Sequence, residues 1–344
     1  MNKSLSPGIK KVVLSRLVLN YALLSLLILP VLAPAEIKPI SLQATTLNGT
    51  PLYSPAPSEK AMANLAAARL AQQASPDDPD LLIWLGRRTA YTGDFLGAIE
   101  IYTRGIEKFP NDPRFYRHRG HRYISVREFE KASGTLEIAS KLISGTKNEM
   151  EPDGVPNPLG IPISSLHGNI WYHLGLAYYL QQDWENALRA YTIGYNSARN
   201  DDNKVSTTHW RYMILRRMGK HLEAETVLSG ITDGMNVIEN TNYYNLCLFY
   251  KGLISLEDLT RDLEDNPGGA AIAYGVANWH YLEGQTTSAR RQLEALTNST
   301  SWAGFGFIAA EADLYHWSNQ EASKTIFGGI PSLVGACNIC LTYF

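Results

Sequence analysis

Residues 171–191 read WYHLGLAYYLQQDWENALRAY. Four apolar or small residues of this stretch stand at positions i, i+3, i+4 and i+7: Trp171, Leu174, Gly175 and Tyr178. That spacing places them on one face of a helix. Gln182 and Asp183 mark a turn, and a second helix that contains Ala187 follows. Because Gly175 and Ala187 are small where two helices must approach closely, the stretch predicts an antiparallel helix hairpin.

The hairpin recurs along the chain with a period of 34 residues. Similar residues stand one period apart at several places: Pro76 and Pro110; Gly86 and Gly120; Ala98 and Ala132; Tyr102 and Leu136; and Ala71, Gly105 and Ala139. A fourth unit begins near Val205, and beyond residue 238 the spacing becomes irregular. A fixed period of this length is typical of repeat proteins, in which each hairpin stacks on its neighbours.

Residues 171–191 match the pattern W-x2-L-G-x2-Y…A-x3-F of tetratricopeptide repeats, with Tyr191 in place of the phenylalanine. The chain resembles the tetratricopeptide family from about residue 60 to residue 317. The resemblance implies an all-α fold, a right-handed α-solenoid of antiparallel helix hairpins. It divides the chain into a repeat block at 58–238, made of a capping helix and four repeats, and degenerate helical repeats at 239–317.

The first 35 residues are expected to direct export. A positively charged start is followed by an apolar run from Leu17 to Ala33, and Ala33-Pro34-Ala35 fits the site of a signal peptidase. An uncleaved membrane anchor is the alternative, because the run is nearly long enough to span a bilayer. We predict a signal peptide at 1–35, an extended proline-rich linker at 36–57, and a periplasmic or extracellular location in a bacterial envelope.

The composition argues against some classes of partner. The 344 residues include 31 basic and 33 acidic residues, a formal net charge of -2. The chain as a whole is therefore not expected to bind nucleic acid. Hydrophobic residues make up 45% of the sequence, which is enough for a buried core. Because the cysteines are only Cys247, Cys337 and Cys340, no disulfide framework is expected.

Two motifs that could carry chemistry are weak. His118 and His121 stand three apart on one predicted helix and could chelate a metal, but the arginines around them would repel a cation. Cys337 and Cys340 form a C-x-x-C pair inside an apolar tail at 318–344, with no room for the helix that a redox motif needs after it. No cofactor, metal site or catalytic residue is therefore predicted.

An insertion interrupts the repeats between Gly145 and Ser165. It holds four prolines and three glycines and fits no helical period. Long loops inside a compact array are usually functional or disordered. Two interpretations stay open: a tolerated insertion on the outer rim, and a flap over a binding groove.

In tetratricopeptide proteins the first helices of successive hairpins line a concave groove that binds extended peptides or short helices. The resemblance places ten residues in this groove: Trp84, Arg87, Arg117, His118, His121, Tyr172, His173, Tyr179, His209 and Trp210. Arginine donors suit carboxylates, and aromatic rings suit peptide planes and apolar side chains. The expected ligand is a protein or peptide with a carboxylate-bearing segment. The Lys/Asn/Lys/Arg set with which some family members hold a C-terminal carboxylate does not recur, since Ile83 and Arg87 occupy two of its positions.

These features predict an exported, non-enzymatic scaffold that captures a peptide or protein segment in the groove. The alternative is an envelope enzyme, or its accessory subunit, with residues 145–165 as a lid. A structural module that assembles through its terminal hairpins is a third hypothesis. Membrane contact is expected only through an uncleaved leader or the C-terminal tail, and neither is favoured.

Overall fold

The computed structural model describes residues 41–261 and 269–327, with side chains as far as Glu321. The predicted signal peptide at 1–35 and the C-x-x-C pair of the tail lie outside the described residues. In the described ranges no helix is long and apolar enough to cross a membrane.

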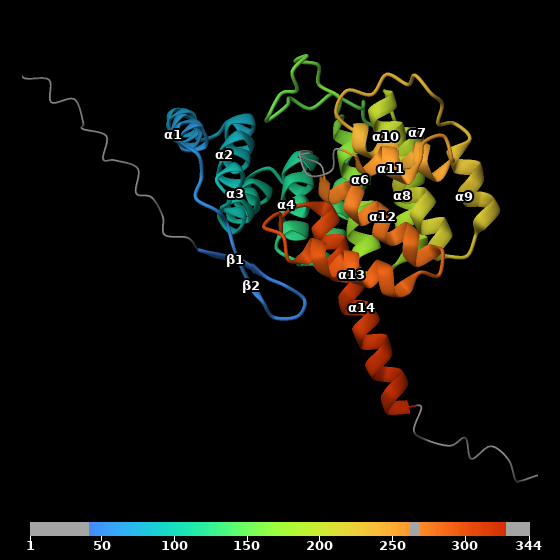
Figure 1. The fold of residues 1–344 in the computed structure, drawn as a ribbon. Coiled ribbons are helices and arrows are strands. Elements are labelled where there is room, and N and C mark those ends of the chain that lie inside the picture. The colour runs from blue at the N-terminus through green and yellow to red at the C-terminus, as the bar shows by residue number, and fades with distance from the viewer. Residues whose placement is uncertain (1–40, 262–268, 328–344) are drawn as a thin grey trace, which may run out of the picture. The chain divides into compact units, whose positions relative to one another are not determined.

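Four helix hairpins follow one another from α2 to α9, as the 34-residue period predicts (Figure 1). Their helices are α2 (Pro79–Tyr91) with α3 (Phe95–Lys108), α4 (Pro113–Ser125) with α5 (Phe129–Leu142), α6 (Leu166–Leu180) with α7 (Trp184–Asn196), and α8 (Asp201–Arg217) with α9 (His221–Leu228). A longer helix, α1 (Glu59–Ala74), precedes them and packs on α2. The predicted all-α solenoid of antiparallel hairpins is confirmed.

The repeat period has a packing cause. The same contact between the two helices occurs in three hairpins: Gly86 with Tyr102, Gly120 with Leu136, and Gly175 with Tyr191. A Cβ atom on Gly86 would lie only 2.4 Å from the ring of Tyr102. A glycine in the first helix therefore makes room for a large side chain of the second, and the hairpin closes around it.

The helix starts repeat as well. Asp78 accepts a hydrogen bond of 2.8 Å from the amide of Asp80, and Asp112 accepts one of 3.0 Å from the amide of Arg114. Proline follows each of these caps at the first helical position, where its missing N–H costs nothing. The Asp-Pro pairs therefore fix where α2 and α4 begin.

A short β-hairpin stands where an extended linker was predicted at 36–57. Its antiparallel strands are β1 (Leu42–Thr45) and β2 (Pro51–Tyr53). Asn48-Gly49 lies in the turn, with a φ of 88° at the glycine, a conformation that Asn-Gly turns favour. The side chain of Gln43 accepts a hydrogen bond from the amide of Phe95 and so fixes the hairpin to the start of α3. The linker prediction was wrong for 42–53, because this turn and the buried Gln43 give the segment a fixed partner.

The C-terminal helices cover the first helices of the middle repeats instead of continuing the regular stack. They are α10 (Thr241–Tyr250), α11 (Leu256–Thr260), α12 (Gly269–Leu282), α13 (Thr286–Thr297) and α14 (Phe305–Phe327). α12 contacts α8 and α10, and α14 contacts α6 (Figure 1). Phe307 joins the core of α2 and α3, while Ile308 joins the core of α6 and α8. One helix therefore seals two parts of the hydrophobic core.

Two buried ion pairs hold α14 in place. Arg127, in the turn between α4 and α5, places its Nη2 2.8 Å from Oε2 of Glu311. Glu311 also accepts a hydrogen bond of 2.9 Å from the amide of Leu47 in the β-hairpin. Further along α14, Asp313 pairs with Arg217 of α8 at 2.6 Å. Segments that are far apart in the sequence are thus joined through one helix.

Candidate functional site

Three of the predicted groove residues are part of the core. Tyr179, His209 and Trp210 are almost completely buried. The ring of Tyr274 in α12 lies 6.3 Å from that of Tyr179 and 6.2 Å from that of Trp210, measured between centroids. The prediction of an open groove at these positions was wrong, because α12 and α14 cover the faces of α6 and α8 that a regular solenoid leaves exposed.

The other seven predicted residues lie on α2, α4 and α6. His118 and His173 are buried, and the remaining five are half-buried: Trp84, Arg87, Arg117, His121 and Tyr172. The rings of His121 and His173 lie 4.2 Å apart between centroids, which brings α4 and α6 into direct contact. Trp84 lies further along, with the guanidinium of Arg87 over its ring at 4.3 Å.

A cavity of about 340 Å³ opens beside this group. Four predicted groove residues line it: Arg117, His121, Tyr172 and His173. Its other walls come from α8, from Phe305 at the start of α14, and from Ser164 and Ser165 at the end of the insertion. Its volume is in the range of pockets that bind small molecules or single side chains. The structure thus brings part of the predicted groove together around an enclosed space.

Guanidinium groups dominate the electrostatics of this region. Arg122 is buried beside His121, and burial lowers the pKa of Arg122 to about 10, with Arg117 and Arg87 acting in the same direction. Within the described chain Arg122 forms no ion pair, and its guanidinium lies 5.2 Å above the ring of Phe95. A buried cation without a counter-ion is costly, so the region favours an anion.

The three histidines do not add to this charge at neutral pH. Burial lowers the pKa of His118, His121 and His173 well below the ordinary value for histidine. The neighbouring guanidinium groups of Arg117 and Arg122 lower these pKa values further. The rings therefore act as neutral hydrogen-bonding groups and as walls of the cavity.

The insertion at 145–165 lies on this face of the molecule. Glu151 places its carboxylate 3.0 Å from Nη2 of Arg117, and Asn169 donates a hydrogen bond to the same carboxylate. Arg87 donates to the carbonyl of Pro152 at 2.8 Å. Of the two interpretations of the insertion, its position over Arg87 and Arg117 matches the flap.

Two asparagines near the cavity were missed by the sequence reasoning. Asn169 and Asn203 line it from α6 and α8 and stand one 34-residue period apart. Oδ1 of Asn203 is buried and has no hydrogen-bond partner in the described part of the chain. A primary amide donates and accepts at once, as a peptide group requires. The period that reveals the repeats could have indicated this pair.

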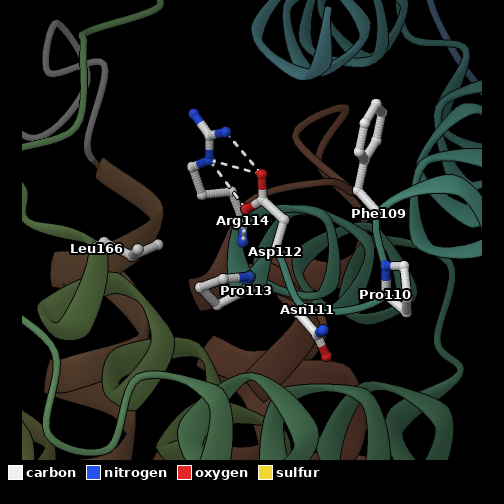
Figure 2. A pocket seen from close by; sticks show the side chains of 7 residues that line it. All are labelled: Phe109, Pro110, Asn111, Asp112, Pro113, Arg114 and Leu166. Atoms are coloured by element: carbon white, nitrogen blue, oxygen red, sulfur yellow. Dashed lines mark hydrogen bonds and ion pairs between the residues drawn. The ribbon is translucent and has the colours of Figure 1, made fainter. Parts of the chain in front are cut away.

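A second hollow is a weaker candidate. It lies at the turn between α3 and α4 and is lined by Phe109, Pro110, Asn111, Asp112, Pro113, Arg114 and Leu166 (Figure 2). Arg114 is the charged donor there, and it is already paired with Asp112 at 2.6 Å and with Asp80 at 2.5 Å. Since its guanidinium has two internal carboxylate partners, this hollow has little capacity for an anion.

The hairpin geometry decides the type of repeat. Two helices of 13 to 15 residues, a short turn, and a glycine-to-large-residue contact recur in three units with the 34-residue period. The chain has the tetratricopeptide repeat fold. In this tetratricopeptide solenoid the candidate site lies between the first helices of the second, third and fourth repeats.

Comparisons with known proteins give similarity of fold only. No family model and no curated protein sequence matches the chain. Among solved structures, it is similar to YrrB, described as a tetratricopeptide protein with an unusual peptide-binding site, with 14% identity over 75% of this chain and 98% of that chain and a TM-score of 0.39. It is also similar to tetratricopeptide-like repeats of a putative kinesin light chain of Podosopora anserina, with 13% identity over 71% and 98% and a TM-score of 0.38. At these values neither likeness carries a functional argument.

Buried histidine should make the stability depend on pH. His209 stays neutral in the folded chain, where burial lowers its pKa to about 3, whereas the unfolded chain takes up a proton near pH 6.5. The contribution is complete above about pH 6.5 and is lost as the pH falls towards 3, at about 1.4 kcal/mol per pH unit. Urea unfolding at pH 7 and pH 5 should show this loss, and His209→Phe should reduce it by about 2 kcal/mol. The matched control is His221→Phe at an exposed position of α9, and equal slopes in both variants would contradict the assignment.

Proposed function

We propose that this chain is an exported, non-enzymatic scaffold that captures a carboxylate-bearing segment of a protein or peptide. The observation that carries the proposal is the cavity beside Arg117, where three guanidinium groups have one internal carboxylate, that of Glu151. Export rests on the leader at 1–35, which the sequence predicts and the described residues do not include.

The cavity offers partners for each part of a peptide. Arg117 can donate two parallel hydrogen bonds to a carboxylate. Asn169 and Asn203 can pair with a backbone amide, since each carries both a donor and an acceptor. Tyr172 and Phe305, whose ring centroids lie 6.2 Å apart, form an aromatic wall for an apolar side chain.

An enzyme or an enzyme's accessory subunit is the second candidate. The position of the insertion over Arg87 and Arg117 favours it, because a loop of this kind can serve as an active-site lid. Hydrolase activity that survives rigorous purification and disappears when residues 152–163 are deleted would support this candidate.

Removing the guanidinium of Arg117 should abolish capture of the segment. The test uses a library of labelled eight-residue peptides with free or amidated C-termini and measures binding by fluorescence anisotropy. A charge-assisted hydrogen bond contributes about 1.5–3 kcal/mol, so Arg117→Gln should weaken binding by about 10–100-fold. Arg104→Gln makes the same charge change at an exposed position of α3 and should leave the affinity unchanged. Equal affinity of the two variants would reject the site, and no selected peptide at all would reject the function.

A further inference from the structure

Residues 151–154 of the insertion contact the helices of the repeats in the way that a bound peptide would. The side chain of Glu151 is about nine-tenths buried, with 11% exposed, and lies between α4 and α6. Its carboxylate contacts Arg117 at 3.0 Å, accepts a hydrogen bond from Asn169, and lies 3.8 Å from Nε2 of His118. These are the groups that line the candidate site.

The backbone after Glu151 is held as well. Arg87 donates to the carbonyl of Pro152 at 2.8 Å, and Arg88 donates to the carbonyl of Gly154 at 3.1 Å. Proline fixes its own φ and restricts the preceding residue to extended conformations. Glu151 is therefore presented on an extended backbone that crosses from α6 towards α2, with arginines reading its carbonyl groups.

The insertion is anchored at its neck and by Glu151, and its tip is loosely held. At the neck, the amide of Glu151 donates to the carbonyl of Ser164 at 2.9 Å. At the tip, Val155 and Leu159 are 76% and 66% exposed and so contribute little to the core. The part of the insertion beyond the neck could lift away from the repeats without exposing buried apolar surface. The contacts at stake are mainly those of Glu151, Pro152 and Gly154.

We propose that Glu151–Gly154 is an internal copy of the ligand, and that the partner recognised by this scaffold is an extended acidic peptide with a glutamate before a proline. The partner's glutamate replaces that of Glu151 at Arg117 and Asn169. This inference rests on the proposed function and adds to it the ligand class and an internal competitor. A short tether holds the internal segment at an effective concentration in the millimolar range, so an external peptide binds only as well as it outcompetes that segment.

The test measures binding of a labelled peptide with the sequence of residues 151–156, EPDGVP, to the full chain by fluorescence anisotropy. Glu151→Gln removes the internal carboxylate and should lower the Kd for this peptide by about tenfold or more relative to the unchanged chain. Glu149→Gln is the matched control, because it removes one charge from the same insertion at a residue whose side chain is 63% exposed. Arg117→Gln in the Glu151→Gln background should remove the binding.

The outcomes separate this inference from the proposed function. If Glu151→Gln and Glu149→Gln bind EPDGVP alike while library peptides still need Arg117, the internal competitor is overturned and the scaffold function stands. Tight binding that persists without Arg117 also overturns the inference, because it places the peptide elsewhere. If no carboxylate peptide binds any of these proteins, both are overturned. Circular dichroism checks the fold, and Glu151→Asp, which shortens the reach to Arg117, replaces Glu151→Gln if that variant loses helix.

Discussion

Replacing Glu311 with alanine should lower the free energy of unfolding by about 3–5 kcal/mol. The substitution leaves the guanidinium of Arg127 buried with no carboxylate, since the two side chains are 5% and 3% exposed and 2.8 Å apart. Arg127 keeps hydrogen bonds to the carbonyls of Ser125 and Trp302, and these do not neutralise its charge. The amide of Leu47 loses its acceptor at the same time. Urea unfolding followed by circular dichroism measures the loss.

The neighbouring residue provides a matched control for this effect. Glu128 forms an exposed ion pair with Lys131 at 3.1 Å, one residue away from Arg127. Surface pairs of this kind contribute about 0–1 kcal/mol, so Glu128→Ala should change little. Replacing both buried partners, Arg127→Met with Glu311→Leu, should cost less than Glu311→Ala alone, because no uncompensated charge is left inside. A loss no larger than that of Glu128→Ala would contradict the assigned role of the pair.

Replacing Gly306 with alanine should destabilise the chain by about 3 kcal/mol. A Cβ atom at this position of α14 would lie 2.1 Å from the carbonyl oxygen of Ala270 in α12. Because the obstacle is backbone, no side chain can rotate away, and the two helices must move apart. Differential scanning calorimetry should show a clear fall in Tm.

Gly134 shows what the same substitution does without a neighbour. It lies within α5, and a Cβ atom there would meet nothing within 4 Å. Gly134→Ala should therefore keep only the gain in helix propensity, about 0.5–1 kcal/mol. If Gly306→Ala were as harmless as Gly134→Ala, α12 and α14 would not be packed as closely as described.

The sequence predicts the repeats well because their contacts are local. Gly175 and Tyr191 meet across one turn, and the pattern that brings them together recurs one period away. The burial of Trp210 has no such signal. It depends on α12 and α14, which pack on α8 and α6 from far along the chain, where the spacing no longer follows the period. Residues that a regular array leaves open are therefore covered, and only contacts of large sequence separation reveal it.

The candidate site was predictable in its cations and aromatic rings but not in its anion. Arg117, His121 and Tyr172 follow from the face of a first helix, because the helical period fixes which side chains share that face. Glu151 lies in a proline-rich insertion without periodicity, so nothing in the sequence places it against Arg117. Asn169 and Asn203 did carry a signal, one period apart, that a search for polar as well as apolar repeats would detect.

The clasp between Arg127, Glu311 and Leu47 also bears on how this chain folds. Arrays held only by neighbouring repeats can open from either end, one unit at a time. Here one carboxylate joins positions separated by 184 and 264 residues, and closing such long loops costs entropy before the contacts can form. Folding should consequently be slow for a helical protein. Once formed, the clasp ties the fate of the first repeats to that of the last helix, so the molecule opens as a whole.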